Sequence, residues 1–132
     1  MKYLCFGYYD KGKFEVMTES ERNAMFDACI EYDDHLRASG HWAGGEALQG
    51  PETGLTLHWR NGTVATTDGP YTETKEQLGG ILMLEARDIN HAIQLMSQHP
   101  GLKIGSWEIR PAGDMSEILK ASEQRRQKHV AG

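Results

Sequence analysis

The stretch from Asp68 to Gly80 combines turn-forming residues with a dense run of ionisable side chains. Asp68-Gly69-Pro70 predicts a sharp turn, because glycine tolerates positive φ and proline fixes φ. A polar run over 71–77 follows, and Gly79-Gly80 then introduces an apolar strand. A carboxylate held at a strand end suits a general base or an anchor for a polar ligand, so Asp68 is the leading catalytic and ligand-binding candidate. The alternative is an Asx turn, in which the Asp68 side chain only shapes the loop.

Tyr71, Glu73 and Lys75 are the further ligand-binding candidates of this run. Loops carry binding residues disproportionately often, and these three offer a hydroxyl, an acid and a base within five positions. Backbone hydrogen bonds to Asp68 would lower its pKa, which favours ligand anchoring over proton abstraction. The alternatives are packing for Tyr71 and a solvated salt-bridge surface for Glu73 and Lys75.

The six histidines show no metal-ligand spacing, because the sequence contains neither HxH nor HxxxH. It also lacks a GxGxxG motif, a phosphate-binding P-loop and a Ser-His-Asp order. We therefore predict neither a metal site nor a cofactor. Several strand residues are candidates for lining the sheet face or a cleft, with ordinary strand packing as the alternative: His41, His58, Trp42, Trp59 and Glu46.

The composition is that of one soluble domain. The chain has 132 residues and a formal net charge of −5, without a basic stripe, so it is a poor candidate for binding nucleic acid. It contains neither an apolar run long enough to cross a membrane nor a signal peptide. Cys5 and Cys29 lie in apolar patterns, which indicates reduced core residues of a cytoplasmic protein.

The hydrophobic pattern predicts alternating strands and helices. Thr18 and Glu21 form a capping box before a helix that ends at Gly40. On this helix, Cys29 belongs to an apolar stripe with Met25, Phe26, Ile30, Tyr32 and Leu36, whereas Asp33, Asp34 and Arg37 fall mostly on the solvent side. The other expected elements are strands at 2–9, 41–49, 55–60, 63–67, 81–86 and 107–111, an Asn61-Gly62 hairpin turn, a helix after Asp88, and a C-terminal helix from Asp114 that frays beyond Ser122.

This order predicts a ferredoxin-like α+β fold, a βαββαβ unit with an extra hairpin and a C-terminal helix. Strands 2–9 and 81–86 should be central, and both are apolar at odd and even positions. Two helices cover only one face of such a sheet, and monomers rarely expose a large apolar face. A second copy is the simplest cover, so we predict a homodimer.

Three motifs resemble the DGPF branch of the YciI-like, YCII-related proteins, a bacterial family. Residues 68–80 match its signature with Tyr71 in place of phenylalanine, 44–49 match its Gly-Gly-Glu-x-Leu segment, and 105–111 match its Gly-Ser-x-Glu-Ile-Arg-Pro ending. The resemblance covers residues 1–112 as one domain and leaves 113–132 as a C-terminal helical extension. It implies a dimeric α+β barrel with a cleft in each unit.

One departure from the family pattern concerns chemistry. Shorter YciI proteins are thought to use a histidine on the first helix and an aspartate just before a proline after the second helix. The corresponding positions here fall at about Cys29 and His99, so that His/Asp pair is absent. A Cys29–His99 pair is one alternative, and inert packing of Cys29 is the other.

The resemblance favours a protein that binds, or also transforms, a small polar molecule in a cleft beside the Asp-Gly-Pro loop. The alternative is a non-catalytic regulatory or protein-interaction module, because relatives of this family are often encoded beside extracytoplasmic-function sigma factors. The sequence does not decide whether the protein is an enzyme. The predicted partners are therefore a second copy of the chain and a small-molecule ligand, without nucleic acid or membrane.

Overall fold

The computed structural model describes residues 1–131. The elements follow one another as β1 (Lys2–Asp10), α1 (Lys11–Glu15), α2 (Glu19–Ala38), β2 (Trp42–Ala47), η1 (Pro51–Thr53), β3 (Leu55–Arg60), β4 (Thr63–Asp68), β5 (Glu76–Glu85), α3 (Ile89–Met96), η2 (Pro100–Lys103), β6 (Trp107–Pro111) and α4 (Ser116–Ala131).

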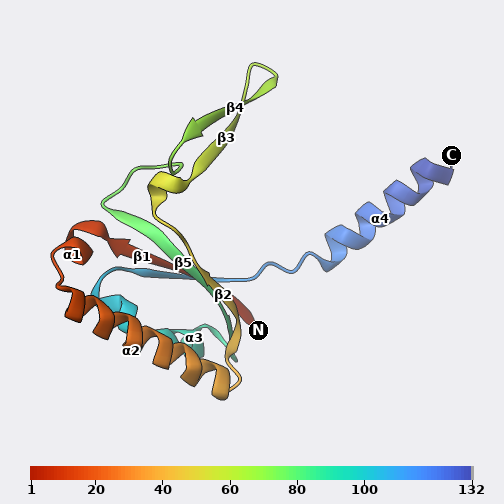
Figure 1. Cartoon of the computed structure of the whole chain (residues 1–132). Helices are drawn as coiled ribbons and strands as arrows, with labels where there is room; N and C mark the ends of the chain where they lie inside the picture. Colours follow the sequence, from red (N-terminus) through yellow and green to blue (C-terminus); the bar gives the residue numbers. More distant parts are fainter. Residues whose placement is uncertain (132) are drawn as a thin grey trace.

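The main sheet has four antiparallel strands in the order β2-β5-β1-β6. The two most apolar strands, β1 and β5, are therefore central, as the sequence predicts. This order is that of a ferredoxin-like α+β unit, which confirms the predicted fold class. Strands β3 and β4 form a separate two-stranded hairpin that projects from the sheet (Figure 1).

Helices α2 and α3 lie on the same side of the sheet (Figure 1). The buried core lies between them and the strands, and Leu36 of α2 is completely buried there. The rest of this core comes from β1, β5 and α3: Tyr3, Cys5, Leu82, Leu84, Ala86, Ala92 and Met96.

The opposite side of the sheet carries a second set of apolar side chains from the central strands. Leu4 pairs with Met83 and Phe6 with Ile81 across β1 and β5, and all four are half-buried. Because strand side chains alternate between faces, these residues point away from α2 and α3. The two helices therefore cover one apolar face and leave the other without a helical layer, as the sequence pattern anticipated.

Local signals in the sequence are confirmed at several element ends. The Thr18–Glu21 capping box is present in both directions at the start of α2. Gly40 ends this helix with a φ of 80°, a conformation that a side chain would strain. Asn61 and Gly62 both have positive φ in the β3–β4 turn, as a two-residue hairpin of the primed type requires.

Two local predictions are wrong, and one short helix is additional to the expected elements. Residues 11–15, to which the sequence pattern assigns neither a helix nor a strand, form α1, because the Asp10 carboxylate accepts hydrogen bonds from the N–H groups of Gly12 and Lys13. Strand β5 begins at Glu76, five residues earlier than expected, since Gln77 and Leu78 already pair with β1. The C-terminal helix α4 continues without fraying through residue 131.

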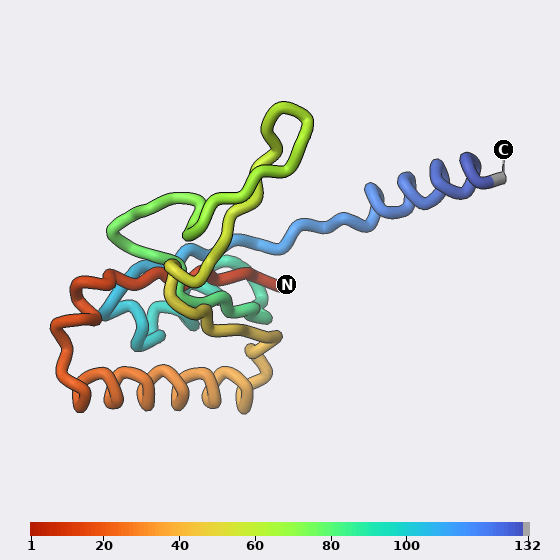
Figure 2. The backbone as a smooth tube through the Cα atoms, turned by 45° about the horizontal axis from the view of Figure 1, so that its top comes forward, coloured from red at the N-terminus to blue at the C-terminus, as the bar shows by residue number. Residues whose placement is uncertain are grey.

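Helix α4 stands apart from the rest of the molecule (Figures 1 and 2). The short segment 112–115 carries it away from β6, and its apolar side chains Ile118 and Leu119 are each 58% exposed. The hairpin is similarly exposed, with Trp59 at 73% and Leu57 at 65%. These two projections contribute little to the buried core.

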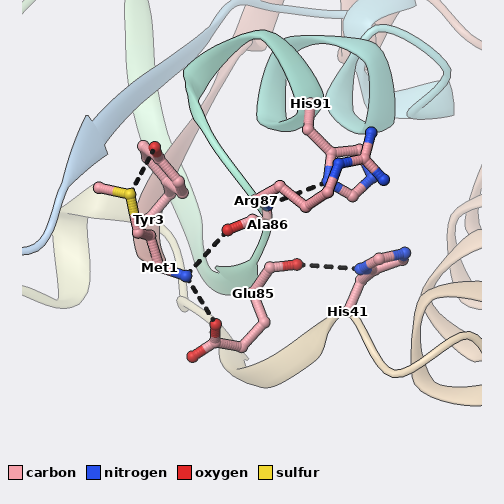
Figure 3. A network of polar contacts seen from close by, with 7 residues as sticks. All are labelled: Met1, Tyr3, His41, Glu85, Ala86, Arg87 and His91. Atoms are coloured by element: carbon pink, nitrogen blue, oxygen red, sulfur yellow. Dashed lines mark hydrogen bonds and ion pairs between the residues drawn. The ribbon is translucent and has the colours of Figure 1, made fainter.

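A polar network joins the N-terminus to the far end of β5 and to α3 (Figure 3). The N-terminal ammonium donates to the Glu85 carboxylate and the Ala86 carbonyl, while the His41 ring contacts the Glu85 carbonyl at 3.0 Å. The rings of His41 and His91 meet edge to face with centroids 5.0 Å apart. Desolvation, followed by the nearby charges of Arg87 and His41, lowers the pKa of His91.

None of the helices within residues 1–131 is both long and apolar enough to span a bilayer.

Candidate functional site

A cavity of about 750 Å³ lies between α2 and the sheet. Residues from β1, α2, β2, β5 and the η2 corner line it. Aromatic rings and charged groups are about equally frequent among the large lining side chains. The side chains that matter below are Phe14, Phe26, Cys29, Asp33, Arg37, Trp42, His99 and Trp107.

Helix α2 supplies one wall because its lining residues fall on a single helical face. Phe26, Cys29, Asp33 and Arg37 recur at intervals of three or four residues, the spacing that stacks side chains along a helix. The fully buried Leu36 holds the C-terminal half of α2 against the core, and Tyr32 donates its hydroxyl hydrogen to the Leu95 carbonyl. These contacts fix the face that carries Asp33.

His99 reaches the cavity from the corner between α3 and β6. It lies just before Pro100 and caps the short helix η2, where the Gly101 N–H donates to His99 Nδ1 at 3.0 Å. The other ring nitrogen, Nε2, lies 3.5 Å from Asp33 Oδ1. His99 is only 5% exposed, so the sequence-distant Asp33 and His99 form a largely desolvated pair.

The His99 ring is confined by aromatic neighbours. Its centroid lies 4.7 Å from that of Trp107 and 5.6 Å from that of Tyr32. Since two rings and one backbone hydrogen bond fix the imidazole, reorientation would require repacking of this corner.

Asp33 is the more accessible member of the pair, with 26% of its side chain exposed. Its Oδ1 atom is nevertheless buried and has no hydrogen-bond partner among residues 1–131. A buried carboxylate oxygen without a partner is costly, so it is a feature that calls for an explanation. The ring nitrogen that faces this oxygen is His99 Nε2 at 3.5 Å, and the pair is not aligned as a hydrogen bond.

Cys29 is half-buried beside this pair, whereas the sequence predicted a buried core position. Cys29 lines the cavity, so one side of its side chain faces open space. Burial, and then the negative charge of Asp33, raise the pKa of the Cys29 thiol. The thiol therefore stays protonated and is a poor nucleophile. The residue of α2 paired with His99 is Asp33, which replaces the Cys29–His99 alternative.

The two ends of the cavity differ in character. At one end, the Phe14 ring lies 6.3 Å from that of Tyr9 and 5.9 Å from that of Phe26. At the other end, the Arg37 guanidinium lies 4.2 Å from the centre of the Trp42 ring and pairs with Asp34 at 2.8 Å. The Asp33–His99 pair lies between an aromatic end and a basic end.

The predicted site residues of the Asp-Gly-Pro loop lie elsewhere. Asp68 is the last residue of β4 and is exposed, as is Glu73. Tyr71 is 79% exposed, and its ring lies 6.3 Å from that of His58. None of these three residues lines the cavity described above.

Lys75 borders a second, more open cavity of about 570 Å³, which shares Tyr8 with the first. Its ammonium lies 3.7 Å from Asp10 Oδ2. Desolvation raises the pKa of Asp10, but the N–H groups of Lys13 and Gly12 and the Lys75 ammonium outweigh it, so this pKa is lowered. Tyr8, Lys13, Thr74 and Glu76 complete the lining.

Some of the strand residues proposed for the sheet face do line the main cavity. Trp42 and Glu46 are part of its wall. By contrast, His58 bonds Thr67 on the hairpin, Trp59 is exposed, and His41 belongs to the N-terminal network.

The sequence pattern does not predict Asp33 as a site residue, because it places Asp33 on the solvent side of α2. The four-residue spacing from Cys29 through Asp33 to Arg37 was the one available signal.

Comparisons with known proteins agree with this fold. The family model of the YCII-related domain matches residues 1–116. None of the curated proteins matches the chain. A solved structure of 5-chloro-2-hydroxyhydroquinone dehydrochlorinase from Burkholderia phenoliruptrix, in complex with 2,5-dihydroxybenzoquinone, is similar with a TM-score of 0.52 at 18% identity over 86% of this chain and 94% of that chain. The match over residues 1–116 shows that the chain belongs to the YCII-related family.

Proposed function

We propose that the protein binds a small, planar, polar molecule in the cavity between α2 and the sheet. The observation that carries this proposal is Asp33, a cavity-lining carboxylate whose side chain is 26% exposed and whose buried Oδ1 atom lacks a hydrogen-bond partner within the described chain. A volume of about 750 Å³ is within the usual range of small-molecule pockets. A ligand hydroxyl that donates to the exposed part of this carboxylate would form a hydrogen bond to a charged group.

The lining of the cavity supports a ring-shaped ligand. Phe14, Phe26, Trp42 and Trp107 offer ring faces and edges against which a flat molecule stacks favourably. The dehydrochlorinase of similar fold was solved with a dihydroxybenzoquinone, which is such a molecule. That likeness is an analogy between folds and supports only the class of ligand.

The loop residues Asp68, Tyr71, Glu73 and Lys75 remain a prediction for ligand binding. Lys75 lies at the second cavity, which shares Tyr8 with the main one. The loop is therefore near one end of the proposed site, and Asp68 as a catalytic or anchoring residue stays a separate hypothesis that mutation can test.

We also propose that the protein is a homodimer through the uncovered face of the sheet. Leu4, Phe6, Ile81 and Met83 lie there between charged flanking side chains, in the arrangement of an apolar centre with a polar rim. Light scattering at micromolar concentration should give twice the mass of one chain. A stable monomer of 14.8 kDa would refute the dimer and leave the cavity unaffected.

The binding proposal is tested by filling the cavity. Cys29→Trp places an indole in the space, whereas Ile30→Trp adds the same group at the neighbouring position, which is 58% exposed and outside the lining. Titration calorimetry with 2,5-dihydroxybenzoquinone should show binding to the wild type and to Ile30→Trp and a loss of at least tenfold in affinity for Cys29→Trp.

Equal affinities in both tryptophan variants would place the ligand outside this cavity. Circular dichroism confirms that each variant is folded before titration. Cys29→Ala separates the loss of space from the loss of the thiol, because it removes the sulfur without filling the cavity.

The protein-interaction alternative has one observation in its favour. One face of the β3–β4 hairpin is apolar and exposed. Its side chains are two residues apart on β3 and directly opposite on β4: Leu55, Leu57, Trp59 and Val64. If this face binds a sigma factor, Trp59→Ser should abolish binding of a purified extracytoplasmic-function sigma factor in a gel-filtration experiment. Intact ligand binding in that variant would show that the two functions are separate.

A further inference from the structure

His99 Nδ1 accepts a backbone hydrogen bond, whereas Nε2 faces Asp33 Oδ1 without forming a hydrogen bond to it. Because a backbone N–H donates to Nδ1 at 3.0 Å, that nitrogen presents its lone pair and carries no proton. In a neutral imidazole the proton is then on Nε2, the nitrogen that faces Asp33 Oδ1 at 3.5 Å. His99 therefore has no free lone pair with which to accept a proton from a ligand.

This arrangement reverses the order found in Ser-His-Asp sites. There the histidine gives its Nδ1–H to the aspartate and uses the free Nε2 as the base. Here the backbone occupies Nδ1, so the N–H directed at the carboxylate belongs to Nε2. Burial of all but 5% of His99 and the flanking rings of Tyr32 and Trp107 oppose a ring flip that would exchange the roles.

Asp33, unlike His99, has a lone pair available to accept a proton from a ligand in the cavity. It lines the cavity, keeps 26% of its side chain exposed, and has a buried oxygen without a hydrogen-bond partner among residues 1–131. Its negative charge reaches the neighbouring cavity wall, since it contributes to the raised pKa of Cys29.

We propose that the cavity is an active site for proton abstraction next to a carbonyl, with Asp33 as the catalytic base and His99 as a positioning residue that keeps its own proton. The substrate class is a small ring compound that carries a C–H bond adjacent to a carbonyl. This inference rests on the proposed binding of a planar ligand in the same cavity, and it adds a reaction and a division of roles to that proposal.

The proposed step is balanced without a further reactant. The Asp33 carboxylate forms an O–H bond with the substrate proton, the C–H bond breaks, and its electron pair moves to the carbonyl oxygen as an enolate. Asp33 exchanges the proton with solvent and returns it to carbon. Arg37 lies one helical turn from Asp33, about 6 Å along the axis, and lines the same cavity while it pairs with Asp34.

The reaction is measured with 2-indanone as the probe, by loss of its α-proton signal in D2O as deuterium replaces hydrogen. The wild type should accelerate exchange over buffer, and Asp33→Asn should lose about 100-fold or more of that acceleration, the scale of general base catalysis. Asp27→Asn is the matched control, because Asp27 is an exposed carboxylate on the same helix outside the cavity lining.

Two variants of His99 separate positioning from base catalysis. His99→Gln can keep an N–H donor near Asp33 but cannot act as a base, whereas His99→Leu removes the donor. We expect His99→Gln to retain exchange within about tenfold of the wild type and His99→Leu to fall well below it. If both variants lose as much as Asp33→Asn, His99 is the base and the proposed roles are wrong.

The wild type gives a test that no folding defect can obscure. Side-chain nitrogen NMR of the labelled full chain should show His99 protonated at Nε2 and bare at Nδ1, with and without 2-indanone. An Nδ1–H ring or an imidazolium would overturn the assignment. If 2-indanone binds but its α-protons exchange no faster than in buffer, the catalytic proposal is wrong and the binding proposal stands.

Discussion

The Asp-Gly-Pro loop and the cavity beneath the sheet differ in the strength of their sequence motif and in the burial of their polar residues. The loop has the strongest motif in the sequence, yet Asp68, Tyr71 and Glu73 are exposed on it. The cavity has no contiguous motif, yet it brings together Asp33 and His99, which are 66 positions apart.

A contiguous motif and a packed cavity carry different information: the motif sets the local backbone path, and the cavity sets the chemical environment. Asp68-Gly69-Pro70 encodes a chain reversal, and Gly69 adopts a φ of 92° that favours glycine. Such a motif describes how the backbone turns between the hairpin and β5. Chemistry that depends on desolvation and on a partner distant in sequence arises only when the elements pack.

The largest difference in stability should come from replacing a leucine by alanine in the core and on the exposed hairpin. Leu36→Ala creates a cavity in the core beneath α2 and should lower the free energy of unfolding by about 2–5 kcal/mol. Leu57→Ala on the exposed hairpin should change it by less than about 0.5 kcal/mol. Urea denaturation measures both, and equal losses would show that the hairpin is packed in solution.

Replacing an aspartate by asparagine in the cavity and in the loop compares the contribution of each site to ligand affinity. Asp33→Asn should weaken binding of 2,5-dihydroxybenzoquinone by about 1–3 kcal/mol, the scale of a lost hydrogen bond to a charged group. Asp68→Asn should have the same effect only if the loop hypothesis is correct. If Asp68 is a turn residue, its variant should instead lower the melting temperature and leave the affinity per folded molecule unchanged.

Acidification should reduce the stability that the polar corner around His91 contributes. Desolvation, then Arg87 and His41, lower the pKa of His91 against the opposing effect of Asp88, so the unfolded chain binds its proton more readily. The stability that neutral His91 contributes is fully present above the pKa of about 6.5 that histidine has in the unfolded chain. It is lost as the pH falls through the lower pKa of His91 in the folded protein. The free energy of unfolding should therefore fall less steeply between about pH 7 and 5 in His91→Gln than in the wild type. Parallel pH profiles would exclude this contribution.

The smallest effect is expected from removal of the C-terminal extension. We propose that residues 1–112 form the folding unit, because Ile118 and Leu119 of α4 are exposed and the helix stands apart from the sheet. Truncation after Pro111 should change the free energy of unfolding by about 0.5 kcal/mol or less. A loss above about 3 kcal/mol would show that α4 packs against a second copy or against the sheet.

The fold was predictable because its signals are local. The Thr18–Glu21 capping box, the Asn61-Gly62 turn and the doubly apolar strands each act over a few residues, and together they determine the order of elements. The candidate site was less predictable. Asp33 looked like a solvent residue of α2, since its helical position does not reveal that a cavity separates this face from the sheet.

Amide chemical shifts of the wild type, mapped during titration with 2,5-dihydroxybenzoquinone, distinguish a ligand in the cavity from a ligand at the loop. We expect the largest shifts at Cys29, Asp33, Gly80 and Gly101, which line the cavity. Saturating shifts confined to residues 68–75, with the cavity signals unmoved, would contradict binding in the cavity.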